Sequence, residues 1–239
     1  MYLPVKVPLQ EITDPLLEEK SLRVFVKRED LIHEKISGNK WRKLVYNLQY
    51  AKAKQFSTLV TFGGAFSNHI AATAAAGKEF GFKTIGVIRG EEYLPLNSTL
   101  HYASACGMEF RYVNRSAYRE KSSKEFQEKY LSDIQDYYLI PEGGTNELAV
   151  QGCEEILADM ELDFDVVCCA CGTGGTISGL INSLKPHQKA IGFPALKGAG
   201  FLAEEIDKYV KNSQWSLNLD YHFLQQINSL CSFLSIDIF

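Results

Sequence analysis

A repeated alternation of short apolar runs and longer segments with helical spacing constrains the fold of this chain most. Each run is rich in β-branched or aromatic residues and leads through a turn into the next helical segment; the runs cover residues 57–64, 83–90, 109–114, 136–144, 164–175 and 189–196. This order is typical of an α/β fold with parallel sheets covered on both faces. The continuous apolar run over residues 166–170 predicts a central strand buried on both sides.

Length and charge exclude several classes of protein. The chain has 239 residues, of which 46% are hydrophobic and 23% charged, with a net charge of -4. It can therefore bury a sizeable core, and it has no basic excess that would attract nucleic acid. The first 20 residues mix prolines and acids, and no window reaches the roughly 18 apolar residues of a membrane span. We expect a cytoplasmic protein without a nucleic-acid or membrane partner.

The cysteines do not indicate a metal site. They lack the repeated C-x-x-C spacing of a zinc centre, and a cytoplasmic chain keeps its thiols reduced. We expect them to act as small buried apolar residues; they are Cys106, Cys153, Cys168, Cys169, Cys171 and Cys231.

Three strand-to-helix turns are candidates for function, because ligands of α/β proteins gather at the carboxyl ends of the strands. The clearest turn lies in "CACGTGGTISGL" and consists of Gly172, Thr173, Gly174, Gly175 and Thr176. Its backbone N–H groups can surround an anion at a helix N-terminus. Neither the Walker pattern nor the G-x-G-x-x-G spacing of a dinucleotide site is present. The turn predicts a phosphate cradle, with a plain glycine-rich turn as the alternative.

The other two turns have a simpler alternative explanation. In "GGAFSNH" (63–69), Ser67 and Asn68 suit a ligand carboxylate or ring hydroxyl, but they are also good helix N-caps. In "PEGGTNE" (141–147), we favour a helix start capped by Thr145 or Asn146. The spacing alone does not show whether the three turns converge.

A lysine follows the turn-forming residues of "SGNKWRKL" (37–44). Lys40 stands at the start of a predicted helix, where the helix dipole mildly disfavours a positive charge. It is either a solvated side chain or an amine kept near a loop for chemistry. An amine can form a Schiff base with an aldehyde, and pyridoxal phosphate combines an aldehyde, a phosphate and a ring.

Three segments taken together resemble a known family. "VKREDLIHEKISGNKWRKL", "TFGGAFSNH" and "CGTGGTISGL", in this order, are similar to the pyridoxal-phosphate-dependent 1-aminocyclopropane-1-carboxylate deaminase and D-cysteine desulfhydrase family, within the tryptophan-synthase-β-like superfamily. The similarity extends from about residue 11 to residue 223. It implies two parallel-sheet α/β domains of PLP fold type II: a large cofactor domain formed by residues 1–43 and 153–239, and a small domain formed by residues 44–152.

The resemblance also implies roles for the candidate residues. Lys40 would hold the cofactor covalently and move protons at the substrate carbon, and Lys43 would lie close to the phosphate. Ser67 would be a nucleophile or proton relay, Asn68 would bond the ring oxygen, and residues 172–176 would bind the phosphate.

Further expectations concern the reaction. A Schiff-base lysine must be neutral when it attacks, so burial and a nearby cation, Arg42 or Lys43, should lower the pKa of Lys40. The resemblance implies a lyase or deaminase that releases ammonia and a 2-oxo acid from a small amino acid. His69 favours the desulfhydrase-like members, although it can also be a plain polar residue in the first turn of a helix. The oligomeric state is left open, with a homodimer as one expectation.

The end of the sequence departs from the family pattern. Family members continue past the "DYHF" segment through a glycine-tyrosine turn to a second tyrosine and a partner of the pyridine nitrogen, whereas this sequence reads "DYHFLQQINSLCSFLSIDIF". Either this apolar tail, with Leu224, Ile227, Leu230 and Leu234 near helical spacing, replaces that segment in a working enzyme, or the chain is a C-terminally incomplete product. We favour the second interpretation, in which the cofactor pocket lacks one wall. The leading expectation for the function is still the lyase or deaminase, and the alternative is a non-catalytic remnant that at most binds the cofactor.

Overall fold

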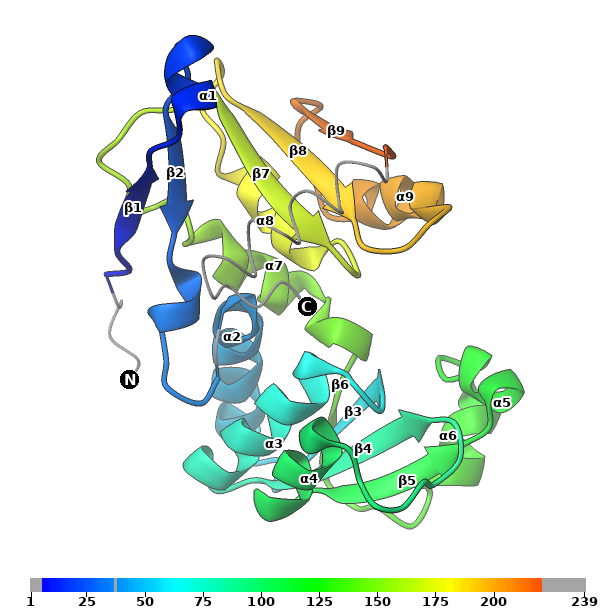
Figure 1. The fold of residues 1–239 in the computed structure, drawn as a ribbon. Coiled ribbons are helices and arrows are strands. Elements are labelled where there is room, and N and C mark those ends of the chain that lie inside the picture. Colours follow the sequence, from blue (N-terminus) through cyan, green and yellow to red (C-terminus); the bar gives the residue numbers. More distant parts are fainter. Residues whose placement is uncertain (1–5, 37, 221–239) are drawn as a thin grey trace.

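The structure, a computed structural model, describes residues 6–36 and 38–220. In this part of the chain the strands form three sheets (Figure 1). The smallest is an antiparallel hairpin of β1 (Leu9–Ile12) and β2 (Val24–Lys27), with the short helix α1 (Pro15–Glu19) between its strands. The other two sheets are parallel, as the strand-turn-helix repeat predicts.

The larger parallel sheet has the strand order β5-β4-β3-β6. Its strands are β3 (Thr58–Gly64), β4 (Lys83–Arg89), β5 (Glu109–Val113) and β6 (Tyr137–Ile140). The helices that alternate with them are α3 (Asn68–Phe80), α4 (Ser98–Ala105), α5 (Arg115–Arg119) and α6 (Lys124–Leu131).

Both faces of this larger sheet are covered by helices. Successive side chains of a strand point to opposite faces, and on β3 Leu59 packs with Ala72 and Ala75 of α3, while Val60 packs in a second cluster with Phe126 of α6. The fully buried character of β3 follows from this double cover.

The smaller parallel sheet has the order β7-β8-β9. It comprises β7 (Val166–Cys171), β8 (Lys189–Pro194) and β9 (Trp215–Leu217), with α8 (Gly175–Asn182), the 3-10 turn η3 (Ala199–Phe201) and α9 (Leu202–Asp207) along the chain. Its core packs α8 and α9 against the strands, with Ile177, Ile181 and Ile206 almost completely buried.

The prediction of a central, doubly buried strand over residues 166–170 is wrong for the described chain. β7 is an edge strand there, and Val166, Cys168 and Ala170 are exposed while the alternate residues are covered. An apolar run shows that both faces of a strand could be buried, but it does not specify which neighbours cover them.

The predicted burial of the cysteines holds only in part. Cys153 and Cys171 are buried, Cys106 and Cys169 are half-buried, and Cys168 is exposed. Cys231 and the predicted helical pattern of Leu224, Ile227, Leu230 and Leu234 lie outside the described residues. In the described ranges no helix has the length and apolarity required to cross a membrane.

Two helices lie between the parallel sheets, α2 (Asn39–Ala53) and α7 (Glu147–Glu154) (Figure 1). They approach so closely that a Cβ at Gly152 of α7 would lie 1.9 Å from the carbonyl oxygen of Arg42. On its other side α7 meets α8, where a Cβ at Gly179 would lie 2.4 Å from the Cβ of Cys153. The predicted domain boundaries, 43/44 and 152/153, fall inside α2 and α7, and the division into domains stays a prediction.

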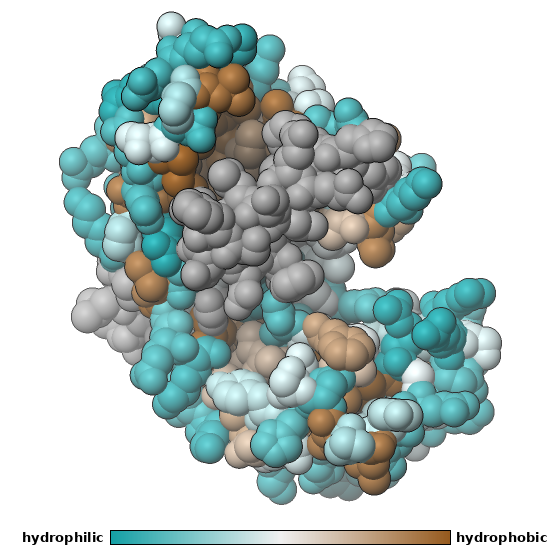
Figure 2. Space-filling view, viewed as in Figure 1, coloured by the Kyte–Doolittle hydropathy of each residue, from teal (hydrophilic) through white to brown (hydrophobic). Residues whose placement is uncertain are grey.

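Short 3-10 turns complete the description, η1 (Glu29–Leu31) before α2 and η2 (Glu142–Gly144) before α7. In the space-filling view the surface is hollowed between the part that carries α9 and the part that carries α5 (Figure 2). The helices α2 and α7 thus connect two sheets whose outer parts stand apart.

Candidate functional site

Lys40 lies in the first turn of α2, which begins at Asn39. Gly38 precedes the helix with φ +63°, a left-handed conformation that suits glycine. Asn39, which precedes Lys40 among the turn-forming residues of the sequence, is already the first residue of α2. The Lys40 side chain is half-buried, and within the described residues its amine has no hydrogen bond or ion pair. Burial, and secondarily the charge of Lys43, lowers the pKa of Lys40 from 10.5 to about 7. A substantial fraction of this amine is therefore uncharged near neutral pH.

Lys43, one turn further along α2, is the most completely bonded side chain of the site. It is only 2% exposed. Its Nζ donates to the carbonyl oxygen of Gly143 at 2.9 Å, to Thr145 Oγ1 at 3.1 Å and to Thr173 Oγ1 at 3.3 Å. Burial lowers its pKa as well, but three oxygen acceptors favour its charged form. Lys43 thereby connects α2 to the turn at residues 141–147 and to the glycine-rich turn at residues 172–176.

Arg42 is not the cation that lowers the pKa of Lys40, a role for which the sequence offered Arg42 or Lys43. Its guanidinium donates from Nε and Nη2 to the two carboxylate oxygens of Glu29, at 2.9 and 3.1 Å, and its Nη1 lies 3.5 Å from Glu155. This paired charge is not among the causes of the lowered Lys40 pKa. Of the two cations that the sequence offered, Lys43 is the one that acts on Lys40.

The glycine-rich turn joins β7 to α8. Gly174 is the N-cap of α8 with φ +83°, and no side chain caps the first turn of this helix. A Cβ at Gly172 would meet no atom of the described residues within 4 Å, so this part of the chain leaves the space over Gly172 open. Thr176 accepts a hydrogen bond at 2.8 Å from Nδ2 of Asn39, the residue next to Lys40. The turn that could hold a phosphate is therefore hydrogen-bonded directly to the start of α2, the helix that carries Lys40 and Lys43.

The third turn combines a cap with a part of the site. Asn146 is the N-cap of α7, because its side chain accepts from the N–H of Ala149 at 2.9 Å, and the capping prediction is confirmed for this residue. Thr145 does not cap the helix; its hydroxyl lies 2.6 Å from that of Thr173 and also accepts from Lys43. Sequence reasoning missed this contribution, since a threonine near a helix start resembles a cap.

The second turn shows its capping role most clearly. Ser67 is the N-cap of α3, and its hydroxyl accepts from the N–H of Ile70 at 3.4 Å; Asn68 is the first residue of the helix. Among the described contacts, none joins Ser67 to Lys40 or to the glycine-rich turn. The structure thus brings Lys40, Lys43 and residues 173–176 into one network but supplies no such bond for Ser67.

His69 is not a plain polar residue of a helix start, since it is buried with 1% exposure and points inward. Thr61 donates its only hydroxyl hydrogen to the carbonyl oxygen of Ile140 at 2.9 Å and lies 2.8 Å from His69 Nε2. His69 Nε2 must then carry a hydrogen and donate it to Thr61. Its Nδ1 is buried and has no hydrogen-bond partner among residues 6–36 and 38–220.

The charge state of His69 agrees with this arrangement. Burial, followed by the charges of Lys40 and Lys43, lowers the pKa of His69 well below its ordinary value of 6.5. A Cβ at Gly144 would lie 2.9 Å from His69 Cε1 and 3.6 Å from Lys43 Cβ, which places the imidazole beside the lysine helix and η2. A neutral imidazole with a bare Nδ1 therefore lies close to both lysines.

These observations test whether the site fits an aldehyde that carries a phosphate. Lys40 is an amine of lowered pKa without a partner among the described residues, Gly172 borders open space, and the buried Nδ1 of His69 is an unused acceptor. The uncapped start of α8 favours an anion. Fold and site together define an α/β protein whose residues fit pyridoxal phosphate.

Comparisons with known proteins agree with this class. The family model described as "Pyridoxal-phosphate dependent enzyme" matches residues 6–212. The chain belongs to this family, whose cofactor is pyridoxal phosphate.

Curated proteins similar to this chain carry names more specific than that of the family. A Pyrococcus horikoshii protein named "Putative 1-aminocyclopropane-1-carboxylate deaminase" is 30% identical over 88% of this chain and 67% of its own length, and a Thermotoga maritima protein of the same name is 35% identical over 74% and 60%. An Arabidopsis thaliana "Bifunctional D-cysteine desulfhydrase/1-aminocyclopropane-1-carboxylate deaminase, mitochondrial" is 30% identical over 66% of this chain and 44% of its own length. The chain thus spans about two thirds or less of the lengths of these relatives.

Solved structures agree on the fold. An "ACC deaminase homologue" superposes with a TM-score of 0.82 at 26% identity, covering 98% of this chain and 80% of that chain. Maize serine racemase gives a TM-score of 0.67 at 18% identity over 97% of this chain and 79% of its own, which supports the fold alone. The predicted fold class, with parallel-sheet α/β architecture of PLP fold type II, is confirmed.

Proposed function

We propose that this chain acts as a pyridoxal-phosphate-dependent deaminase or desulfhydrase, releasing ammonia and a 2-oxo acid from a small amino acid such as 1-aminocyclopropane-1-carboxylate or D-cysteine, with the sulfur of D-cysteine leaving as hydrogen sulfide. The observation that carries the proposal is Lys40, an amine with a pKa of about 7 beside a glycine-rich turn and without a partner in the described chain. The printed names of the curated relatives support the choice of substrates.

Different residues of the site would bind different groups of the cofactor. Lys40 would bond the aldehyde carbon, because its neutral amine is a nucleophile near neutral pH. The N–H groups of residues 172–176 would bind the phosphate at the start of α8, and Lys43 would add positive charge beside it. Asn68, the first residue of α3, would bond the ring oxygen.

The proton transfers would fall to side chains of this chain. When bound, the cofactor supplies an electron sink for the negative charge that develops at the substrate α-carbon. Lys40, whose pKa lies close to neutral, can give and take a proton there without a large energetic penalty. Ser67 would serve as nucleophile or proton relay once substrate replaces its weak 3.4 Å capping bond.

The proposal extends to the arrangement of the chain. Residues 1–43 and 153–239 would form the larger, cofactor-binding domain, and residues 44–152 the smaller one. The bonds between Lys43 and the turns at residues 143–145 and 173 would then hold the two domains together around the cofactor.

Absorbance and mass spectrometry test the cofactor part of the proposal. The purified protein is mixed with pyridoxal phosphate, its spectrum is recorded, and borohydride is added to fix any covalent bond. We expect a visible band that borohydride abolishes, and a peptide containing Lys40 that gains the mass of the reduced cofactor. Lys40→Ala should lose both signals, whereas Lys52→Ala, which removes an exposed lysine from the same helix, should keep them.

Product formation tests the reaction. The loaded protein is incubated with D-cysteine and with 1-aminocyclopropane-1-carboxylate, and 2-oxo acid and ammonia are measured. Equal spectra of wild type and Lys40→Ala would contradict the cofactor role of this lysine. A Lys40-dependent band without any 2-oxo acid would instead favour the alternative that the chain binds the cofactor but does not turn over amino acids.

A further inference from the structure

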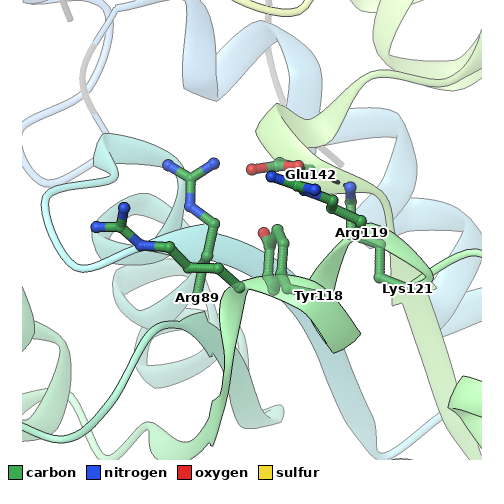
Figure 3. A pocket seen from close by; sticks show the side chains of 6 residues that line it. Arg89, Tyr118, Arg119, Lys121 and Glu142 are labelled. Atoms are coloured by element: carbon green, nitrogen blue, oxygen red, sulfur yellow. Dashed lines mark ion pairs between the residues drawn. The ribbon is translucent and has the colours of Figure 1, made fainter.

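A second group of charged side chains lines a cavity of about 400 Å³ outside the site described above (Figure 3). The group shares no residue with the lysine and glycine-turn network. Its members come from the end of β4, from α5 and the residues after it, and from η2; they are Arg89, Arg115, Tyr118, Arg119, Lys121 and Glu142.

The cavity carries an excess of positive charge. Lys121 forms an ion pair with Glu142 at 3.1 Å, but within the described residues Arg89, Arg115 and Arg119 have no carboxylate partner. Four cations therefore face one carboxylate. The space-filling view shows a hydrophilic surface over α5, which borders the hollow between the two parts of the molecule (Figure 2).

Tyr118 places a buried hydroxyl at this cavity. Its side chain is only 2% exposed, and its hydroxyl makes no hydrogen bond of ordinary geometry in the described part of the chain, but burial and the nearby Glu142 carboxylate raise the pKa of Tyr118. The close-up shows the hydroxyl pointing toward the carboxylate of Glu142 (Figure 3). The Glu142 carboxylate is an acceptor within reach of this hydroxyl, and an oxyanion that pairs with Lys121 in place of Glu142 would offer the hydroxyl a second one.

The Tyr118 ring also organises the cations around it. The guanidinium carbon of Arg89 lies 5.7 Å from the ring centroid, and Nζ of Lys121 lies 4.9 Å from it. Cation–π contacts of this kind hold charged groups in place without neutralising them. The positive charges remain available to an anion.

The cavity is next to the candidate cofactor site. Arg89 ends β4 and pairs in register with Gly64 of β3, at the edge of the sheet where ligands of α/β proteins gather. Glu142 is followed directly by Gly143, whose carbonyl oxygen accepts from Lys43. A ligand that draws Lys121 away from Glu142 would therefore act one residue from the contacts of Lys43.

We propose that this cavity binds a small, multiply charged oxyanion, such as a phosphorylated or polycarboxylate metabolite, at a site separate from the glycine-rich turn. Arginine guanidinium groups bind phosphate and carboxylate oxygens in a two-pronged geometry, and three arginines without carboxylate partners meet here. The Tyr118 hydroxyl donates a hydrogen bond to this oxyanion in place of its interaction with Glu142.

Calorimetric titration tests this proposal on protein saturated with pyridoxal phosphate. The probes are pyrophosphate and citrate, which separate a preference for phosphate oxygens from one for carboxylates. We expect one site per chain for at least one probe, with an affinity that falls as salt is added. The double variant Arg115→Gln/Arg119→Gln should bind at least about tenfold more weakly.

Two further variants keep the test independent of folding and of total charge. Tyr118→Phe preserves the aromatic ring and should lower the affinity for the probe several-fold. Lys83→Gln removes an exposed cation from the opposite end of β4 and should leave the affinity unchanged. Far-UV circular dichroism confirms that each variant is folded.

The outcomes separate this cavity from the cofactor site. Equal affinities in wild type, in the arginine double variant and in Tyr118→Phe would overturn the proposal, as would the absence of saturable binding by both probes. Binding that is lost in Thr173→Val but kept in the arginine variant would place the anion at the glycine-rich turn and would also overturn it. The test does not depend on turnover, so inactivity of the protein towards amino acids leaves the proposal standing.

Discussion

Replacing Lys40 by methionine should stabilise the cofactor-free protein, and the gain should depend on pH. The pKa of Lys40 is about 7 in the folded chain, against an ordinary value of 10.5. Between these values the unfolded chain binds more protons than the folded one, so wild-type stability rises as the pH increases from 7 towards 10.5 and is flat below 7. Lys40→Met removes this titration, so its advantage should be greatest below pH 7 and should vanish near pH 10.5.

The structure sets the size of the effect. At about 1.36 kcal/mol for each pH unit between the folded and unfolded pKa values, the full difference is about 5 kcal/mol. Because the Lys40 side chain is only half-buried, solvent screens part of this cost, and we expect roughly 2–3 kcal/mol. The burial that lowers stability is thus the same feature that makes the Lys40 amine neutral when it reacts.

Urea unfolding at pH values from 6 to 10 measures the prediction on protein stripped of cofactor. The relevant quantity is the pH-dependent part of the difference in unfolding free energy between Lys40→Met and wild type, since the two side chains also differ in apolar surface. Lys52→Met, on the exposed face of α2, is the control and should change stability by less than about 0.5 kcal/mol. A difference between Lys40→Met and wild type that stays constant across the pH range would refute the reasoning.

Two further predictions concern the packing around the site. Gly152→Ala places a methyl group 1.9 Å from the Arg42 carbonyl oxygen, so α2 and α7 must separate; we expect a loss of about 3 kcal/mol or more in stability and a fall in Tm of roughly 6–12 °C. The control Gly200→Ala should change Tm little, because no atom of the described residues lies within 4 Å of its new Cβ. Asn39→Ala removes the 2.8 Å bond to Thr176 and should weaken pyridoxal phosphate binding about five- to tenfold in a fluorescence titration; an unchanged affinity would show that this bond does not position the turn.

Much of the fold could be predicted from local patterns. The β-branched runs and the helical segments that follow them depend on periodicities of two and 3.6 residues, and both are visible in the sequence. The environment of β7 could not be predicted, because its exposed alternate residues, Val166 and Cys168, are as apolar as residues of a central strand. Neighbours that lie far apart in sequence decide that difference.

The candidate site was predictable as a set of residues rather than as a network. The sequence identified Lys40, Lys43 and the glycine-rich turn, and the structure connects them through Asn39 and Thr145. Both connecting side chains occupy positions where a turn or a cap is the ordinary explanation. Their bonds span about a hundred residues or more, and no local pattern records such distances.

His69 shows the same limit for a single side chain. A histidine after a serine and an asparagine at a helix start gives no indication of burial, yet its imidazole is enclosed by Thr61, Gly144 and the lysine helix. Its neutral state follows from that enclosure together with the charges of Lys40 and Lys43. Only the parallel sheet, which aligns β3 with β6, brings these groups together.

The two lysines of α2 both have lowered pKa values, with burial as the main cause, but they differ in hydrogen bonding. Both lie in the first two turns of one helix, but Lys43 donates three hydrogen bonds to oxygens of the first and third turns, whereas Lys40 donates none in the described chain. These acceptors favour the charged form of Lys43 against the cost of its burial, and the charge of Lys43 adds to burial, the larger cause, in lowering the pKa of Lys40. The network around Lys43 therefore contributes a second, smaller part of the shift at Lys40. In this arrangement the glycine-rich turn and η2 contribute to the reactivity of Lys40 without touching it.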